Sequence, residues 1–187
     1  MRLYQILTLA CTSIMISACA SVAPIRDANN VNDKVRFNMD GRFSVQYVEK
    51  NTDKNLTGKM QWEETGRATD IILASPIGTA MASLHVTRNE AVLKTSSGEM
   101  YSEKTPEELL YRTLGYELPF SNLRKMVGTV NQPLADALSI DGWDVKVLQR
   151  FNNYNNLAKK LLISRQDPTP VTMTLFIDER SDAPDSK

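Results

Sequence analysis

Residues 69–86 read TDIILASPIGTAMASLHV, a pattern that predicts a strand, a tight turn and a second strand. Proline fixes φ and glycine tolerates positive φ, so Pro76 and Gly78 mark the turn. Between them stands Ile77, an apolar residue where a turn normally carries a polar one. An apolar tip suggests contact with a partner or with lipid. The alternative is that Ile77 folds back onto its own hairpin, and the pattern leaves both open.

Alternation of apolar and polar residues continues on both sides of this hairpin. Before it, Phe43, Val45 and Tyr47 share one strand face, and Met60 and Trp62 share another. Short polar loops join neighbouring strands, which predicts an antiparallel meander that must curl. Nine strands are predicted, six before residue 105 and three after it. They lie at 43–47, 56–63, the two halves of 69–86, 91–93, a short segment ending near Tyr101, 143–147, 157–164 and 171–177.

Two short helices are predicted in the middle of the chain. Residues 105–108 combine a capping threonine, a proline at the first helical position and two glutamates in the first turn, and Gly115 ends that helix. The paired glutamates complement the helix dipole and are not interpreted as a catalytic pair. The second helix follows Pro119 and stops at Gly128. Helices inserted between strands would cover one open side of the curled sheet.

The first residues have the form of a secretory signal peptide. Arg2 precedes a largely apolar run, residues 3–16, that is shorter than the roughly 20 residues needed to span a bilayer. The run ends in Ile16-Ser17-Ala18-Cys19, which resembles the lipobox of bacterial lipoproteins, in which the cysteine is acylated and becomes the new N-terminus. Ordinary cleavage at a small-residue site is the alternative. Ala20, in place of the aspartate that usually retains lipoproteins in the inner membrane, favours the outer membrane.

These features predict four segments: a signal peptide at 1–18, a lipidated N-terminus and tether at 19–32, one barrel domain at 33–180, and a disordered tail at 181–187. Cleavage would remove Cys11 and leave no disulfide. Without Arg2, 21 basic residues face 22 acidic ones, a balance that does not suggest nucleic-acid binding.

The residues that carry most enzyme chemistry are sparse in this chain. The single histidine, His85, alternates onto the face of its strand predicted to be wet, and no cysteine–histidine cluster suggests a metal site. The eight glycines are scattered singly rather than gathered in a phosphate-binding loop. We therefore expect no catalytic residue, no metal and no cofactor.

Several motifs, taken in order, resemble one family. After the lipobox come DGRFSV at 40–45, Met60-Gln61-Trp62, SPIGT at 75–79, and Leu118-Pro119-Phe120 with Leu123-Arg124. DGWDV at 141–145 and LFID at 175–178 complete the set, which resembles the LolB family of outer-membrane lipoproteins over residues 40–180. Two positions depart from it: Met126 stands where the family usually has tryptophan, and Glu179-Arg180 where its last strand often ends near one.

The resemblance implies a mainly β fold: an incomplete, half-open antiparallel β-barrel with a lid of short α-helices enclosing an apolar cavity. It implies a monomer on the periplasmic side of the outer membrane that takes client lipoproteins from a LolA-like periplasmic carrier and holds their acyl chains. Pro76, Ile77 and Gly78 would form the membrane-insertion loop, and Cys19 would anchor the protein in outer-membrane lipid. The expected cavity lining is Phe43, Val45, Tyr47, Met60, Trp62, Ile71, Leu73, Leu84, Leu93, Leu109, Leu110, Leu114, Leu123, Trp143, Met173 and Leu175.

Two other functions fit much of the same pattern. A LolA-like carrier would share the architecture, but a soluble carrier lacks the lipidated Cys19. A structural lipoprotein would brace an outer-membrane assembly, with the helix leucines filling the core. The small inward residues Ala80 and Ala82 suit a cavity, whereas the helix leucines could fill the same space, and the sequence leaves both open.

Overall fold

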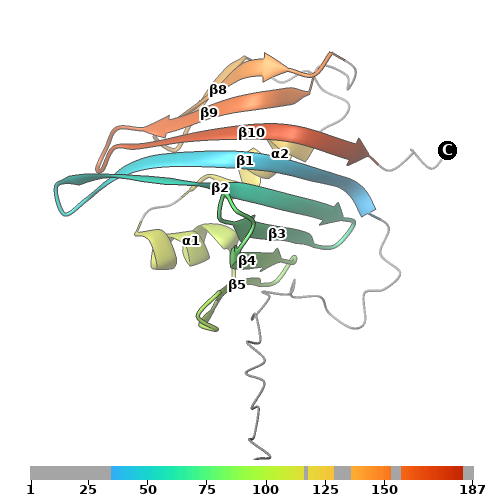
Figure 1. Cartoon of the computed structure of the whole chain (residues 1–187), viewed down its shortest axis with the longest axis horizontal. Helices are drawn as coiled ribbons and strands as arrows, with labels where there is room; N and C mark the ends of the chain where they lie inside the picture. The colour runs from blue at the N-terminus through green and yellow to red at the C-terminus, as the bar shows by residue number, and fades with distance from the viewer. Residues whose placement is uncertain (1–34, 116–117, 129–135, 153–156, 183–187) are drawn as a thin grey trace, which may run out of the picture.

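The computed structural model describes residues 35–115, 118–128, 136–152 and 157–182, which form one antiparallel sheet and two helices (Figure 1). The predicted signal peptide, Cys19 and the tether lie outside these residues. Six strands precede the helices: β1 (Val35–Glu49), β2 (Thr52–Thr65), β3 (Thr69–Ala74), β4 (Ala80–Val86), β5 (Ala91–Thr95) and β6 (Met100–Glu103). After α1 (Pro106–Leu114) and α2 (Phe120–Gly128) come β7 (Ala137–Ile140), β8 (Trp143–Arg150), β9 (Ala158–Arg165) and β10 (Val171–Asp182).

The described sheet has ten strands, one more than predicted, because β7 was missed. Asp141 and Gly142 both have positive φ and form a two-residue turn, across which Ile140 pairs with Trp143. An Asp-Gly pair between two strands is a hairpin signal, so the dipeptide itself pointed to a strand before it.

The strand order is β6-β5-β4-β3-β2-β1-β10-β9-β8-β7, so the first and last strands of the chain pair at the centre. The two edges, β6 and β7, are joined in sequence through the helices. α1 contacts β5, β6 and α2, so both helices lie over one side of the sheet (Figure 1). This arrangement confirms the predicted incomplete antiparallel barrel with a helical lid.

The predicted caps of α1 are confirmed. The Thr105 Oγ1 accepts a 3.2 Å hydrogen bond from the Glu108 N–H, and Gly115 ends the helix in the left-handed conformation. Leu109 and Leu110 are buried under the sheet as expected. The prediction for Leu114 was wrong: its side chain is 49% exposed, because the last residue of α1 has no following turn to cover it.

The C-terminal boundary lies two residues beyond the predicted one. β10 continues through Ser181 to Asp182, because these residues pair with Asn38 and Phe37 at the start of β1. The expectation that the tail begins at Ser181 was therefore wrong. Residues 183–187 lie outside the described part of the chain.

Candidate functional site

The turn between β3 and β4 is closed by its own hydrogen bonds. The Ser75 N–H donates to the Thr79 carbonyl and the Gly78 N–H to the Ser75 carbonyl, both at 2.8 Å. The Thr79 N–H also donates to Ser75 Oγ at 3.1 Å, and Gly78 supplies the positive φ of 93° that the turn needs. The side chain of Ile77 is 90% exposed. The alternative in which Ile77 folds back onto its hairpin is therefore wrong.

A close approach of two strands fixes the base of this turn. Gly58 on β2 lies where β3 ends, and an added Cβ would stand 2.3 Å from the Ala74 carbonyl oxygen and 2.6 Å from the Phe43 ring. Only glycine admits both neighbours at that point. Gly58 thus lets the Phe43 ring lie across β2 directly below the turn.

All but one of the predicted lining residues gather in one apolar cluster under the helices. The exception is Leu114. Trp62 stacks on Phe120 of α2, with ring centroids 5.6 Å apart and planes 3° from parallel. Buried members are Phe43, Met60, Trp62, Ile71, Leu84, Leu109, Leu110, Leu123, Trp143 and Leu175, and partly buried members are Val45, Tyr47, Leu73, Leu93 and Met173.

Accessibility of this inner face rises toward the sheet end that carries the Ser75–Thr79 turn. On β1, Met39 is buried whereas Val45 and Tyr47 are half-buried. The exposure of the side chains rises in the same direction on several other strands. It goes from buried to half-buried from Thr69 to Leu73 on β3, from Val86 to Ala82 on β4, from Ala91 to Leu93 on β5 and from Ile177 to Met173 on β10. Val171 at the start of β10, Ile163 on β9 and Trp143 on β8 lie at this same end but are buried. In the half of the sheet from β1 to β5, the apolar face is thus most accessible at the end where Ile77 lies.

At the opposite end of the inner face, a buried carboxylate holds α2 against the sheet. Glu64, only 4% exposed, accepts a 2.7 Å hydrogen bond from Thr69 Oγ1. Arg124 on α2 donates from Nε to both oxygens of Glu64, at 3.0 and 3.1 Å. The hydrogen bond to Glu64 raises the pKa of Arg124 above its ordinary value, against the lowering effect of burial. The guanidinium therefore stays charged against the carboxylate.

A second arginine fixes the end of the same helix. Arg180, at one of the two positions that depart from the family pattern, lies over the Phe37 ring at 4.5 Å and donates to the carbonyl of Val127 near the C-terminus of α2. A cation there complements the helix dipole. The sequence motif contained Arg124 but gave no role to Glu64, Arg124 or Arg180. The alternation Met60, Trp62, Glu64 was the signal that Glu64 faces inward.

His85 lies on the face of β4 opposite Leu84, as its alternation predicted, but the expectation that it is wet was wrong. Its side chain is 8% exposed, and Nδ1 lies 2.7 Å from Oδ1 of Asp70 on β3. The register places Asp70 directly opposite His85, so the carboxylate shields the ring. The pair is on the outer side of the sheet and does not reach the apolar inner face.

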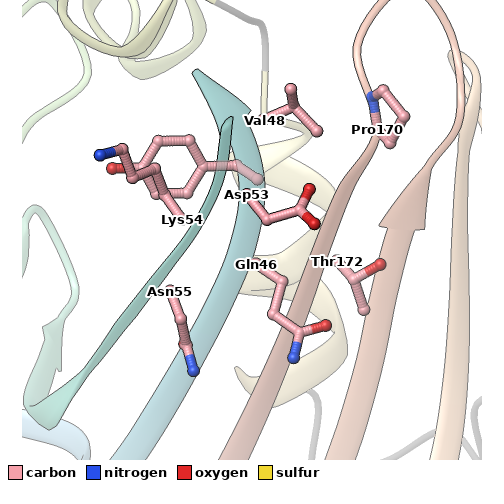
Figure 2. Close-up of a pocket in the computed structure, with 8 residues that line it drawn as sticks. Gln46, Val48, Asp53, Lys54, Asn55, Pro170 and Thr172 are labelled. Carbon is pink, nitrogen blue, oxygen red and sulfur yellow. The ribbon is translucent and has the colours of Figure 1, made fainter. Parts of the chain in front are cut away.

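A separate pocket of about 410 Å³ lies between the β1–β2 hairpin and the start of β10. Figure 2 shows Gln46, Asp53 and Thr172 around this space, whereas Lys54 points away from it. Most of the residues that line it are polar, and of the predicted cavity-lining residues only Tyr47 borders it. It is therefore distinct from the apolar inner face.

Within the described residues, no group of three or more histidine, cysteine, aspartate or glutamate side chains could hold a metal ion. Among the same residues, neither helix has the length and apolar character needed to cross a membrane.

Comparison with known proteins gives one family and several relatives. The family model described as "Outer membrane lipoprotein LolB" matches residues 35–179. A protein named "Outer-membrane lipoprotein LolB" from Cupriavidus pinatubonensis is 28% identical over 184 residues, covering 88% of this chain and 89% of that protein. One of the same name from Cupriavidus taiwanensis is 32% identical over 120 residues, covering 63% and 59%. Among solved structures, a LolA superfamily protein from Nitrosomonas europaea overlaps 80% of this chain and 89% of its own, with a TM-score of 0.45 and 7% identity.

Proposed function

Because this chain belongs to the LolB family of outer membrane lipoproteins, we propose that it receives acylated lipoproteins from a LolA-like periplasmic carrier and inserts them into the outer membrane. One structural observation supports this most directly. In the half of the sheet from β1 to β5, the apolar inner face is most accessible at the end that also presents the 90% exposed Ile77. An acyl chain leaving that face would meet the bilayer where Ile77 touches it.

In this proposal the receptor is itself held at the membrane by acylated Cys19 and faces the periplasm as a monomer. Each acyl methylene removed from water contributes about 0.8 kcal/mol, so several chains give a lasting anchor. The lipidated cysteine also distinguishes the proposed receptor from a soluble LolA-like carrier.

Transfer in this proposal needs no bond chemistry and no nucleotide. Client acyl chains pass from the carrier to the inner face because that face binds them more tightly, and then to the bilayer, which buries them completely. The half-buried residues Val45, Leu73 and Met173 suit such a step, because a site that leaves part of a chain accessible releases it more easily than a closed one. The predicted lining residues would make the cavity, with Leu114 left outside it.

The test of Ile77 uses a loaded carrier, liposomes and the unlipidated receptor. Ile77→Glu is expected to leave the thermal unfolding midpoint and acyl binding unchanged and to lower delivery into liposomes at least tenfold, because a carboxylate costs several kcal/mol to insert into lipid. Leu148→Glu is the matched control, because Leu148 is 48% exposed on β8, outside the turn. Unimpaired delivery by Ile77→Glu would sink the role given to the turn.

The structural-lipoprotein alternative makes a different forecast in the same assay. A filled core would take up no client from the loaded carrier, whatever residue stands at position 77. Client bound to the wild-type receptor, captured before liposomes are added, therefore decides between a receptor and a brace.

A further inference from the structure

The described chain enters the sheet at the end opposite the Ser75–Thr79 turn. Val35, the first residue of β1, pairs with Thr65 at the last residue of β2. Farther along β1, Arg42 pairs with Lys59, and Lys59 pairs with Ala74, the last residue before the turn. Val35, where the described chain begins, and the exposed Ile77 thus lie at opposite ends of the strands.

The separation between these ends follows from the register. Seven residue steps separate Val35 from Arg42, which is level with Ala74, and this corresponds to about 23 Å along a strand. Three further residues, Ser75 to Ile77, carry the tip about 7 Å beyond that level. Ile77 therefore stands about 30 Å from Val35 along the strand direction.

The β1–β2 hairpin sets how this end can approach a bilayer. β1 continues past Arg42 to Glu49, so the hairpin tip reaches about 15 Å farther along the strands than Ile77. Figure 1 shows the β1–β2 hairpin projecting beyond the neighbouring strands. Residues 49–55 are exposed and largely polar, so the tip stays among headgroups while the sheet leans until Ile77 also touches lipid. With the hairpin and the turn about 10 Å apart across the strands, the lean still leaves Val35 about 25 Å from the surface.

The length of the predicted tether matches this requirement. From Cys19 to Val35 the chain makes 16 steps, which reach at most about 54 Å when extended. A flexible chain of 16 residues spans about 22 Å on average, so a distance of about 25 Å lies within the reach of a segment of this length. A much shorter tether would hold the wrong end of the barrel against the membrane.

We propose that the number of residues in the segment 19–34 is what allows the receptor to turn its Ile77 end toward the same bilayer that holds its acyl chains. This inference rests on the proposed function and on acylation of Cys19. It assigns the membrane-facing surface to the sheet end with the turns at 75–79, 96–99 and 141–142. The opposite end, with the turns at 65–68 and 87–90, faces away.

The experiment compares tether variants in full-length, lipidated receptor reconstituted sparsely in liposomes, with a client-loaded carrier and no receptor-free liposomes. Deleting residues 22–33 keeps the lipobox and its two following residues and leaves four steps, a reach of about 14 Å. Delivery is expected to fall at least tenfold. Replacing residues 22–33 by a Gly/Ser segment of equal length should restore delivery to within twofold, because the proposal depends on length and not on side chains.

The unlipidated receptor is the internal control. Without an anchor the barrel turns freely, so the same deletion should leave its delivery into liposomes unchanged. Undiminished delivery by the lipidated deletion variant would overturn the inference, and so would a Gly/Ser variant as poor as the deletion. If the intact lipidated and unlipidated receptors both deliver nothing, the proposed function itself has failed and the inference about segment 19–34 with it.

Discussion

Ile77 and Glu64 stand at opposite ends of the sheet and depart from ordinary burial in opposite directions. Burying an isoleucine side chain would contribute about 2 kcal/mol to stability, and Ile77, which is 90% exposed, contributes little of this within the described residues. A carboxylate only 4% exposed would be costly without partners, and Thr69 and Arg124 supply them. At the scale of single residues, one end of the sheet therefore carries an exposed apolar side chain, and the other end carries a buried charge that is paired with α2.

Removing the Arg124 guanidinium should therefore weaken the attachment of α2 to the sheet at Glu64. Arg124→Met leaves the Glu64 charge buried, and we expect the free energy of unfolding to fall by about 2 kcal/mol, less than for a fully buried pair because Arg124 is 40% exposed. Arg112→Met removes a comparable helix-to-strand ion pair to Glu103 that is more exposed, and it should cost about 0.5 kcal/mol or less.

Urea unfolding of Glu64→Met, of Arg124→Met and of the double variant Glu64→Met/Arg124→Met measures the coupling between the two side chains. The double variant should be more stable than the sum of the single losses predicts, by about 1 kcal/mol or more, because it leaves no buried unpaired charge. Strict additivity of the losses would show that the pair does not hold α2.

At the scale of elements, the β3–β4 hairpin was predicted closely and the lid only in outline. Pro76 and Gly78 define a local turn, and alternation on β3 separates Leu73 from Ile72, so neighbouring residues alone suffice. The attachment of α2 depends on Glu64, which lies 60 residues from Arg124, and no local pattern reports such a pair. β7 was missed although the Asp141-Gly142 turn after it is a hairpin signal, whereas β6, an edge strand of the same length, was predicted.

The two faces of β3 provide a test of the inner apolar face. Leu73→Asp places a carboxylate at its accessible end and should reduce client uptake from a loaded carrier at least tenfold, because the charge must stay hydrated beside an acyl chain. Ile72→Asp, its neighbour on the same strand and equally half-buried, faces outward and should leave uptake within twofold. Capture of radiolabelled client by the soluble receptor gives the readout. Equal losses in both variants would argue for damage to the strand and against a binding face.

At the scale of the whole molecule, the sheet is held together by the pairing of the first and last strands of the chain. β1 and β10 are the first and last strands, yet they pair at the centre of the strand order. The register runs from Phe37 opposite Asp182 to Tyr47 opposite Val171. Each half of the sheet is a local meander that the sequence predicts, whereas this central pairing joins residues more than a hundred positions apart. The overall curl of the domain therefore depends on the last strand arriving in register.

Truncating the chain within β10 should expose that dependence. A chain ending at Asp178 loses four pairings with β1 and the Arg180 contact with α2, for an expected loss of about 3 kcal/mol and a fall of about 6–12 °C in the thermal unfolding midpoint. A chain ending at Asp182 keeps all of them and should unfold like the full domain. Arg180→Met in the full chain should cost part of the difference, which separates the guanidinium from the strand pairing. Circular dichroism melts measure all three, and a chain ending at Asp178 that melts with the full domain would mean that the described end of β10 contributes nothing to closure.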